Sequence, residues 1–227
     1  MTATPIRVWG IGTSRTMRPH WMLAELGLQY ETRKILPRTE GMEEPAFKAL
    51  NHRGKVPVFQ DGELVIGESG AIVFYLAERY RERCALAPRA GSRERAIFDD
   101  LCLYTLMELD APLYIIRRHG GLPEVYGEAP VAVQSAGEYF LRQVAEMDRR
   151  LADGRPFLMG EEFSAADILL ETCLAWAHVV DLELSPLLAG YRDSLAKREA
   201  YTRAFERNFP MIASPLQAKG DEPSGNR

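Results

Sequence analysis

Residues 54–80 carry the most informative pattern in the chain and read GKVPVFQDGELVIGESGAIVFYLAERY. Two short β-prone runs, at 58–60 and 63–66, are separated by the dipeptide Asp61-Gly62. A two-residue Asp-Gly loop between apolar runs is typical of a type I′ hairpin, because both central positions of that turn need a positive φ. The stretch therefore predicts a β-hairpin.

The ends of this hairpin add two further signals. Pro57 enters the first strand, where only an edge or starting position tolerates proline, and an X-Pro bond is the kind of peptide bond that readily adopts the cis form. After the hairpin, Ser69 is placed to cap a helix. Apolar residues then recur at helical spacing, namely Ile72, Val73, Leu76 and Tyr80.

Composition excludes several classes of protein. The 227 residues include 28 Lys and Arg against 32 Asp and Glu, with both signs interspersed, so we expect no binding to nucleic acid. The sequence shows no secretory signal and no apolar run near the ~20 residues that cross a bilayer, so we expect no membrane segment. The 3 Cys and 4 His residues are widely spaced, which argues against a disulfide framework or a metal site. A cytoplasmic protein without a metal is the expectation.

The order of elements predicts two domains. Residues 1–82 read as strand, helix, strand, short helix, hairpin and helix, which indicates a compact α/β domain. A polar linker with Pro88 and Gly91 follows. Residues 92–212 show helical patterns without a convincing strand, so they predict an all-α domain. Residues 213–227 are rich in Gly, Pro, Ser and charge, and are predicted to be disordered.

Three features of the second domain are specific enough to test. Pro112 should break or kink the first helix. The run Ser164-Ala-Ala-Asp167 reads as a capping box, and the helix after it is apolar nearly all round, so it should form the buried centre of the domain. The last amphipathic helix is expected from Tyr191 to Asn208.

With these features in place, the chain resembles the glutathione S-transferase superfamily over roughly residues 5–212. The resemblance rests on Val56-Pro57 before the hairpin, Glu68-Ser69 at the next helix, the linker to a helical domain, and the box ending at Asp167. It implies a thioredoxin-like N-terminal domain that binds glutathione and an all-α C-terminal domain that helps to bind a second substrate. It also implies a cytosolic homodimer.

The resemblance implies a glutathione site around the hairpin. A cis bond before Pro57 would turn the backbone N–H and C=O of Val56 toward the cysteinyl unit, which pairs with them like an added strand. Ser69 at a helix N-terminus suits the γ-glutamyl carboxylate, and Glu68 would answer the γ-glutamyl ammonium. Local sequence alone is equally consistent with Ser69 as a helix cap and Glu68 as a solvated acid. The Val56-Pro57 context favours ligand binding.

Two basic residues are weighed for the glycyl end of glutathione. Lys55 resembles the Gln or Lys that other members of the family place there, and Arg38 is the alternative. Arg18, in the first helix, reads as structural or interfacial and is left out of the site.

The catalytic group of the family lies in the loop after the first strand, as Tyr, Ser or, for thiol-disulfide chemistry, Cys. Here residues 12–16 read Gly-Thr-Ser-Arg-Thr, with no Tyr and no Cys. Counted back from the helix-ending Gly27, Thr13 takes the place of the Ser of the tau, phi, theta and zeta classes, and Ser14 is its neighbour. A hydroxyl there would stabilise the thiolate, which is the nucleophilic form of a thiol. We favour Thr13 and keep Ser14 as the alternative.

The remaining expectations concern the second substrate. The loop at Ile11 and the first helix of the second domain, with Tyr104, Met107 and Glu108, are expected to line its pocket, although core packing explains any single one of them. The implied activity is that of a detoxifying glutathione transferase, which activates the glutathione thiolate for attack on a small hydrophobic electrophile. The alternatives are a non-catalytic binding or regulatory module, and a glutathione-dependent isomerase, dehalogenase or peroxidase.

Overall fold

The computed structural model describes residues 5–211, and these form two compact units. One unit comprises residues 5–86 and 196–211, and the other comprises residues 87–195. The units differ from the predicted domains at the C-terminus, because the last helix belongs to the first unit. The predicted disordered tail, residues 213–227, lies outside the described residues.

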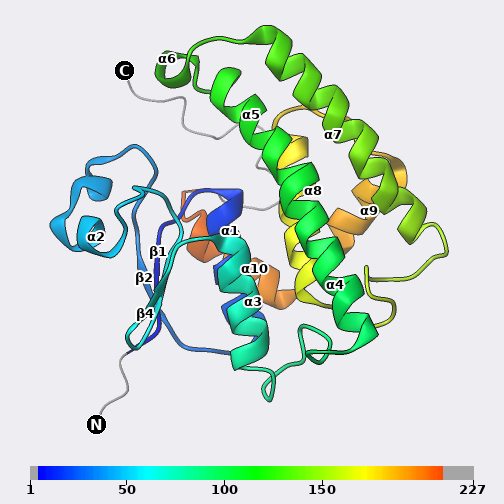
Figure 1. The fold of residues 1–227 in the computed structure, drawn as a ribbon, viewed down its shortest axis with the longest axis horizontal. Coiled ribbons are helices and arrows are strands. Elements are labelled where there is room, and N and C mark those ends of the chain that lie inside the picture. The colour runs from blue at the N-terminus through cyan, green and yellow to red at the C-terminus, as the bar shows by residue number, and fades with distance from the viewer. Residues whose placement is uncertain (1–4, 212–227) are drawn as a thin grey trace. The chain divides into compact units, whose positions relative to one another are not determined.

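The first unit is built on a four-stranded mixed sheet in the order β2-β1-β3-β4 (Figure 1). The strands are β1 (Arg7–Trp9), β2 (Glu31–Arg33), β3 (Val58–Asp61) and β4 (Leu64–Ile66). Strand β1 runs parallel to β2 and antiparallel to β3. Strands β3 and β4 form the predicted hairpin.

The hairpin turn lies one residue later than predicted. Asp61 pairs with Leu64, so the two central residues are Gly62 and Glu63. Gly62 has a φ of 62°, and Glu63 is not among the non-glycine residues with positive φ in the described chain. A positive φ at the first central position alone fits a type II′ turn, so the predicted type I′ turn is wrong.

Helices cover both faces of the sheet. On one face, Trp9 and Val58 pack with Phe47 of α2 (Pro45–Leu50), which follows the 3-10 helix η1 (Glu40–Glu43). On the other face, Phe59 contacts Tyr75 of α3 (Ser69–Arg79), with ring centroids 5.8 Å apart. Helix α1 (Ser14–Glu25) contacts both α3 and α10 (Glu199–Asn208).

Helix α10 is separate from α9 (Pro186–Leu195), so the single helix predicted from Tyr191 to Asn208 is wrong. The chain leaves the helical conformation between them, where Arg198 has a ψ of 135° and serves as the N-cap of α10. This break lets α10 join the first unit, where it packs along α1.

The described part of the second unit is all-helical (Figure 1). Its helices are α4 (Arg93–Tyr104), η2 (Thr105–Asp110), α5 (Ala111–His119), α6 (Pro123–Tyr126), α7 (Pro130–Leu151), α8 (Ala165–Val179) and α9. Helix α8 is buried along most of its length and begins with the predicted capping box of Ser164 and Asp167. The mixed α/β unit and the all-α unit confirm the predicted fold class.

Pro112 interrupts regular α-helix as predicted. The segment η2, which directly precedes α5, has π-helical hydrogen bonding. Proline has no N–H to donate and crowds the carbonyl one turn earlier, and a wider turn accommodates both effects.

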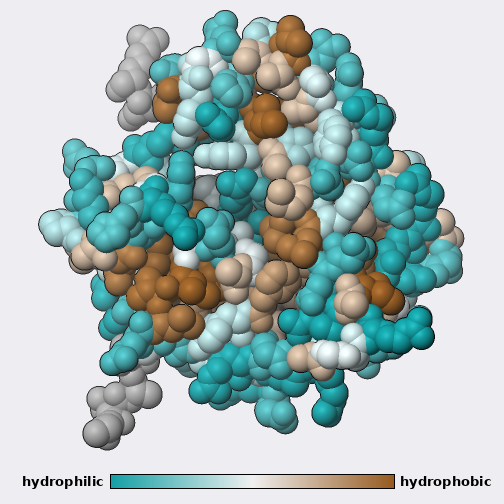
Figure 2. Space-filling model, in the orientation of Figure 1, coloured by the Kyte–Doolittle hydropathy of each residue, from teal (hydrophilic) through white to brown (hydrophobic). Residues whose placement is uncertain are grey.

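Apolar side chains are exposed on both units. Figure 2 shows them over β4 in the first unit and along the α4-η2-α5 segment in the second. In the second unit they include Leu103, Met107 and Ile115. No helix within residues 5–211 is both long enough and apolar enough to cross a membrane.

Glu25 fastens α10 to α1, and its removal provides a test of this packing. Its carboxylate accepts from the Trp21 indole at 2.9 Å and from the Arg198 guanidinium at 2.7 and 2.9 Å. We predict that Glu25→Ala lowers the free energy of unfolding by about 2 kcal/mol, because it takes this acceptor from the buried Trp21 indole and from the part-buried Arg198 guanidinium. Urea unfolding followed by tryptophan fluorescence measures the change.

Glu31→Ala is the matched control, since it removes an exposed ion pair with Arg7. Exposed pairs contribute under about 1 kcal/mol. Equal losses in the two variants would contradict the role given to Glu25.

Candidate active site

The loop between β1 and α1 is shaped by two glycines. Gly10 has a φ of 116° and Gly12 a φ of 83°, conformations that side-chain-bearing residues rarely adopt. A Cβ on Gly10 would lie 2.6 Å from the Cβ of Val56, and a Cβ on Gly12 would lie 2.6 Å from Cδ2 of Leu36. Glycine at position 10 therefore lets this loop pack directly on the Val56-Pro57 segment.

Thr13 caps α1, which begins at Ser14. The Thr13 hydroxyl oxygen accepts from the Thr16 N–H at 3.0 Å, and the Thr16 hydroxyl oxygen accepts from the Thr13 N–H at 2.9 Å. Thr16 in turn donates its own proton to the Thr13 carbonyl at 2.9 Å. The Thr13 proton is then directed either to the Thr16 hydroxyl oxygen, 3.0 Å away, or to a ligand. The Ser14 hydroxyl makes no hydrogen bond within residues 5–211.

The peptide bond between Val56 and Pro57 is cis, as predicted. Pro57 is buried and Val56 half-buried, and no backbone hydrogen bond of the described residues uses the N–H or C=O of Val56. The segment before it is held by Asn51, whose side chain donates to the Lys55 carbonyl and accepts from the Arg53 N–H at 3.1 Å. Both backbone groups of Val56 are thus available to an extended peptide.

Ser69 does not cap α3, which corrects the expectation drawn from the sequence. Glu68 occupies the N-cap position without a side-chain capping bond, and Ser69 is the first helical residue. The Ser69 oxygen instead accepts from Nη1 of Arg18 at 3.0 Å, and the Arg18 side chain is only 1% exposed. Arg18, set aside on sequence grounds, therefore places a buried positive charge beside Ser69. The free N–H groups of the α3 N-terminus add to this field, so the position suits a carboxylate.

Glu68 and Lys55 are exposed at the surface of the same unit. The Glu68 carboxylate accepts from Nη1 of Arg53 at 3.2 Å. Both of those side chains are largely solvated, so the pair contributes little to stability and leaves Glu68 open to exchange its partner for a ligand ammonium. Arg38 is also exposed, and its φ of 62° places it in the left-handed region.

The residues predicted for the second-substrate pocket have different surroundings. Ile11 is buried, and its N–H donates to the Ile35 carbonyl at 3.0 Å. In the second unit, the Tyr104 hydroxyl donates to the Gln143 side chain of α7 at 2.8 Å. Met107 is 64% exposed.

Glu108, the fourth of these residues, accepts a hydrogen bond from the Tyr139 hydroxyl of α7. Tyr104 and Glu108 thus both make polar contacts with α7. The assignment of all four residues to a pocket stays a prediction.

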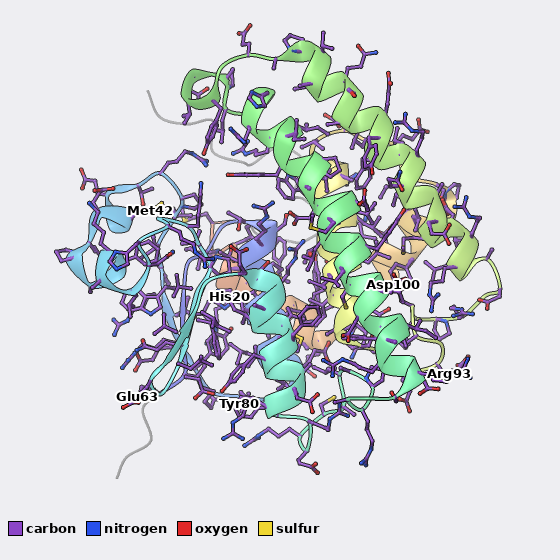
Figure 3. The ribbon with its side chains drawn as sticks, viewed as in Figure 1. His20, Met42, Glu63, Tyr80, Arg93 and Asp100 are labelled. Carbon is purple, nitrogen blue, oxygen red and sulfur yellow. The ribbon has the colours of Figure 1, made fainter. Side chains whose placement is uncertain are left out.

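His20, which Figure 3 labels, contacts the loop between β1 and α1 at Gly10. Its Nε2 lies 3.2 Å from the Gly10 carbonyl, which can only accept, so Nε2 carries the proton. Nδ1 then accepts from the Tyr30 hydroxyl at 2.9 Å. Burial lowers the pKa of His20 to about 4, with a smaller effect in the same direction from the Arg207 guanidinium. Burial also raises the pKa of Tyr30 to about 12, so both groups are neutral at neutral pH.

Four residues of this arrangement were not predicted as site residues: Arg18, His20, Asn51 and Asn208. Asn208, the last residue of α10, donates to the Thr13 carbonyl at 3.0 Å and accepts from the Gly12 N–H. Asn51 precedes a turn ending at Gly54, which is a usual place for asparagine and the one local signal among the four. Arg18 and Asn208 act across 51 and 195 residues, and His20 contacts residues 10 positions away on either side.

Comparisons with known proteins identify the family of this chain. A model described as "Glutathione S-transferase, N-terminal domain" matches residues 4–78, and one described as "Glutathione S-transferase, C-terminal domain" matches residues 130–206. The chain is 28% identical over 235 residues to a glutathione S-transferase-like protein of Aspergillus terreus, covering 91% of this chain and 96% of that protein. It is 29% identical over 197 residues to the maleylacetoacetate isomerase of Pseudomonas aeruginosa, covering 83% and 89%.

A solved structure extends the similarity to the fold. The theta class glutathione S-transferase of Xanthomonas axonopodis pv. citri, with glutathione bound, superimposes with a TM-score of 0.75 at 30% identity. The match covers 92% of this chain and 99% of that one. Together, the fold, the loop between β1 and α1, the cis-proline segment and the two family models define the class of this protein. It is a two-domain protein that binds glutathione. The chain belongs to the glutathione S-transferase superfamily.

The buried His20 predicts an acid-dependent loss of stability. Its folded pKa, about 4, lies below the ordinary 6.5, so the unfolded chain binds more protons between these values. The contribution of neutral His20 to the free energy of unfolding is fully present above pH 6.5. It is lost as the pH falls through this window, and the free energy of unfolding decreases by about 2 kcal/mol between pH 7 and pH 5. Urea unfolding at the two pH values measures the loss.

His20→Gln is the matched variant, because its side-chain amide can still donate to the Gly10 carbonyl but does not titrate. We expect the difference between pH 7 and pH 5 to shrink by about 2 kcal/mol relative to wild type. An unchanged difference would show that His20 is not the titrating group.

Proposed function

We propose that the protein is a glutathione transferase in which the Thr13 hydroxyl stabilises the glutathione thiolate for attack on a small hydrophobic electrophile. The observation that carries the proposal is the hydrogen-bonding state of Thr13. Its oxygen accepts from the Thr16 N–H, while the Thr16 hydroxyl proton is given to the Thr13 carbonyl. The Thr13 proton is left to donate, and a thiolate is a stronger acceptor than the neutral Thr16 oxygen.

The magnitudes are sufficient for this role. A thiol with a pKa near 8.5 is only a few per cent thiolate at neutral pH, and lowering that pKa by ~2 units takes about 2.7 kcal/mol. One charge-assisted hydrogen bond from Thr13 contributes roughly 1.5–3 kcal/mol. The N-terminus of α1, which Thr13 caps, adds about 0.3–1 kcal/mol.

Glutathione binding is assigned to the segments around the glycine loop. The backbone N–H and C=O of Val56 beside the cis Pro57 suit the cysteinyl unit of an extended peptide. Ser69, supported by the Arg18 guanidinium, suits the γ-glutamyl carboxylate. Glu68 suits the γ-glutamyl ammonium.

For the glycyl carboxylate, Lys55 is the first candidate and Arg38 the second. The glutathione bound in the Xanthomonas relative supports glutathione as the ligand. The proposed protein is a cytoplasmic homodimer that acts in detoxification.

A second reaction is favoured by one observation, the 29% identity to a maleylacetoacetate isomerase. In an isomerisation the thiolate adds to the substrate and leaves again, so glutathione is regenerated rather than consumed. The same binding residues and the same hydroxyl serve both reactions. Mass spectrometry of the products separates them, because only conjugation adds the mass of glutathione to the substrate.

The role of Thr13 is tested by a conjugation assay with a general aromatic electrophile, after capture of the protein on immobilised glutathione. We expect Thr13→Ala to lower kcat/KM by about 10–100-fold and to raise the pKa of the bound thiol by ~1–2 units. Thr13→Ser keeps the hydroxyl and should retain most of the activity.

Ser14→Ala is the matched control and is expected to stay within about twofold of wild type. Loss of activity in Ser14→Ala with retention in Thr13→Ala would assign the hydroxyl to Ser14 instead. A wild-type protein that neither binds the resin nor accelerates conjugation or isomerisation would overturn the enzyme proposal and favour a binding module.

Ser69 provides a separate test of binding. We expect Ser69→Ala to raise the KM for glutathione about tenfold with little change in kcat, because its bond to the carboxylate is the same in the ground and transition states. Ser92→Ala, which removes the N-cap hydroxyl of α4, is the control and should leave this KM unchanged. A fall in kcat at unchanged KM would argue that Ser69 acts on the chemistry rather than on binding.

A further inference from the structure

Asn208 holds the peptide groups on both sides of Thr13. Its main-chain carbonyl accepts from the Gly12 N–H at 2.8 Å, and its side-chain Oδ1 lies 3.2 Å from the same nitrogen. Its side-chain Nδ2 donates to the Thr13 carbonyl at 3.0 Å. The residue is fully buried. One side chain thus contacts a donor and an acceptor of the loop that carries the proposed catalytic hydroxyl.

Helix α10 is fixed firmly enough to act as a support for this loop. Near its start, the Tyr201 ring packs edge-on against Trp21 of α1, with ring centroids 4.8 Å apart. Near its end, the Arg207 guanidinium lies 4.4 Å from the centre of the Tyr30 ring and donates to the Tyr30 carbonyl. Because α10 ends at Asn208, the carbonyl of that residue has no partner within the helix and is free to accept from Gly12.

We infer that Asn208 is a positioning residue for the Thr13 hydroxyl, an inference that rests on the proposed function. Gly12, with its φ of 83°, has no side chain to restrict the backbone conformation of the loop. The Thr13 carbonyl receives three donors, namely the Met17 N–H, the Thr16 hydroxyl and the Asn208 amide. Asn208 thereby holds the backbone of the cap residue, and with it the Cα–Cβ bond that carries the Thr13 hydroxyl, in one orientation.

An amide is the side chain that this position requires. The Gly12 N–H offers a donor and the Thr13 carbonyl an acceptor, and asparagine adds a bond to each within one short group, beside the main-chain bond of Gly12 and the two other donors to Thr13. Aspartate keeps the acceptor, but it turns a second oxygen toward the Thr13 carbonyl and brings a negative charge close to the thiolate. Alanine removes both side-chain bonds and leaves the main-chain bond to Gly12.

The test measures kcat, the KM for glutathione and the pKa of the bound thiol, by ultraviolet absorbance of the thiolate, in full-length Asn208→Ala and Asn208→Asp. We expect kcat/KM for the electrophile to fall about tenfold in Asn208→Ala and further in Asn208→Asp. The thiol pKa should rise by ~1 unit while the KM for glutathione stays within about twofold, because the binding segments are untouched. Glu206→Ala, an exposed position on α10, is the control and should change none of these quantities.

A double-mutant cycle with Thr13→Ala separates positioning from general stability. If Asn208 acts through Thr13, Asn208→Ala should have no further effect on kcat in the Thr13→Ala background. An equal loss of kcat in both backgrounds, or a loss of stability with an unchanged thiol pKa, would overturn the inference. If Asn208→Asp does not fold, Asn208→Ala and the cycle decide the question alone.

Failure of this inference is distinguishable from failure of the proposed function. Full activity of Thr13→Ala would refute the hydroxyl assignment itself. Loss of activity in Thr13→Ala together with wild-type behaviour of Asn208→Ala would refute only the role of Asn208.

Discussion

One constraint organises the first unit: the buried polar side chains of α1 must each find a hydrogen-bond partner. A buried polar group without a partner costs on the order of 2 kcal/mol or more, so α1, which is buried at every position from 16 to 23, admits such groups only where partners exist. Three of them are Thr16, Arg18 and His20. Their partners are Thr13, Ser69 and the Gly10 carbonyl, respectively. Each partner belongs to a segment of the candidate site, so the packing of one helix also sets the positions of the groups proposed to bind glutathione.

Helix α1 places a charged side chain beside Ser69 and a neutral one beside the Gly10 carbonyl. Arg18 stays protonated when buried, whereas burial holds the pKa of His20 at about 4 and leaves it neutral. The positive charge therefore lies at the N-terminus of α3, beside Ser69, which is proposed to bind the γ-glutamyl carboxylate. The glycine loop is supported by a neutral imidazole instead, which fixes the Gly10 carbonyl without adding a charge that would change with moderate acidity.

The sequence could predict what depends on neighbouring residues. The cis bond at Pro57, the hairpin strands and the capping box at Asp167 were all indicated by short motifs, and the structure has them. Local reasoning failed where an alternative partner was available. Asp61 joined the ladder and moved the turn, and Ser69 bonded to a buried guanidinium instead of capping its helix. At Ser69 a tertiary contact outweighed the local preference, whereas at Asp61 the competing partner, Leu64, is itself only three residues away.

The part of the site that sequence reasoning missed is the part made by distant segments. Arg18 and Ser69 are 51 residues apart in the sequence, and Gly12 and Asn208 are 196 residues apart. No local sequence pattern therefore predicts either contact. This matters for the interpretation of position 13. Threonine stands there in place of the expected serine, and its branched side chain has fewer favourable χ1 rotamers. The backbone of Thr13 must therefore be held in one orientation for the hydroxyl to point toward a bound thiolate. Because two glycines leave the loop without that constraint, the chemistry proposed for Thr13 depends on a residue almost two hundred positions away.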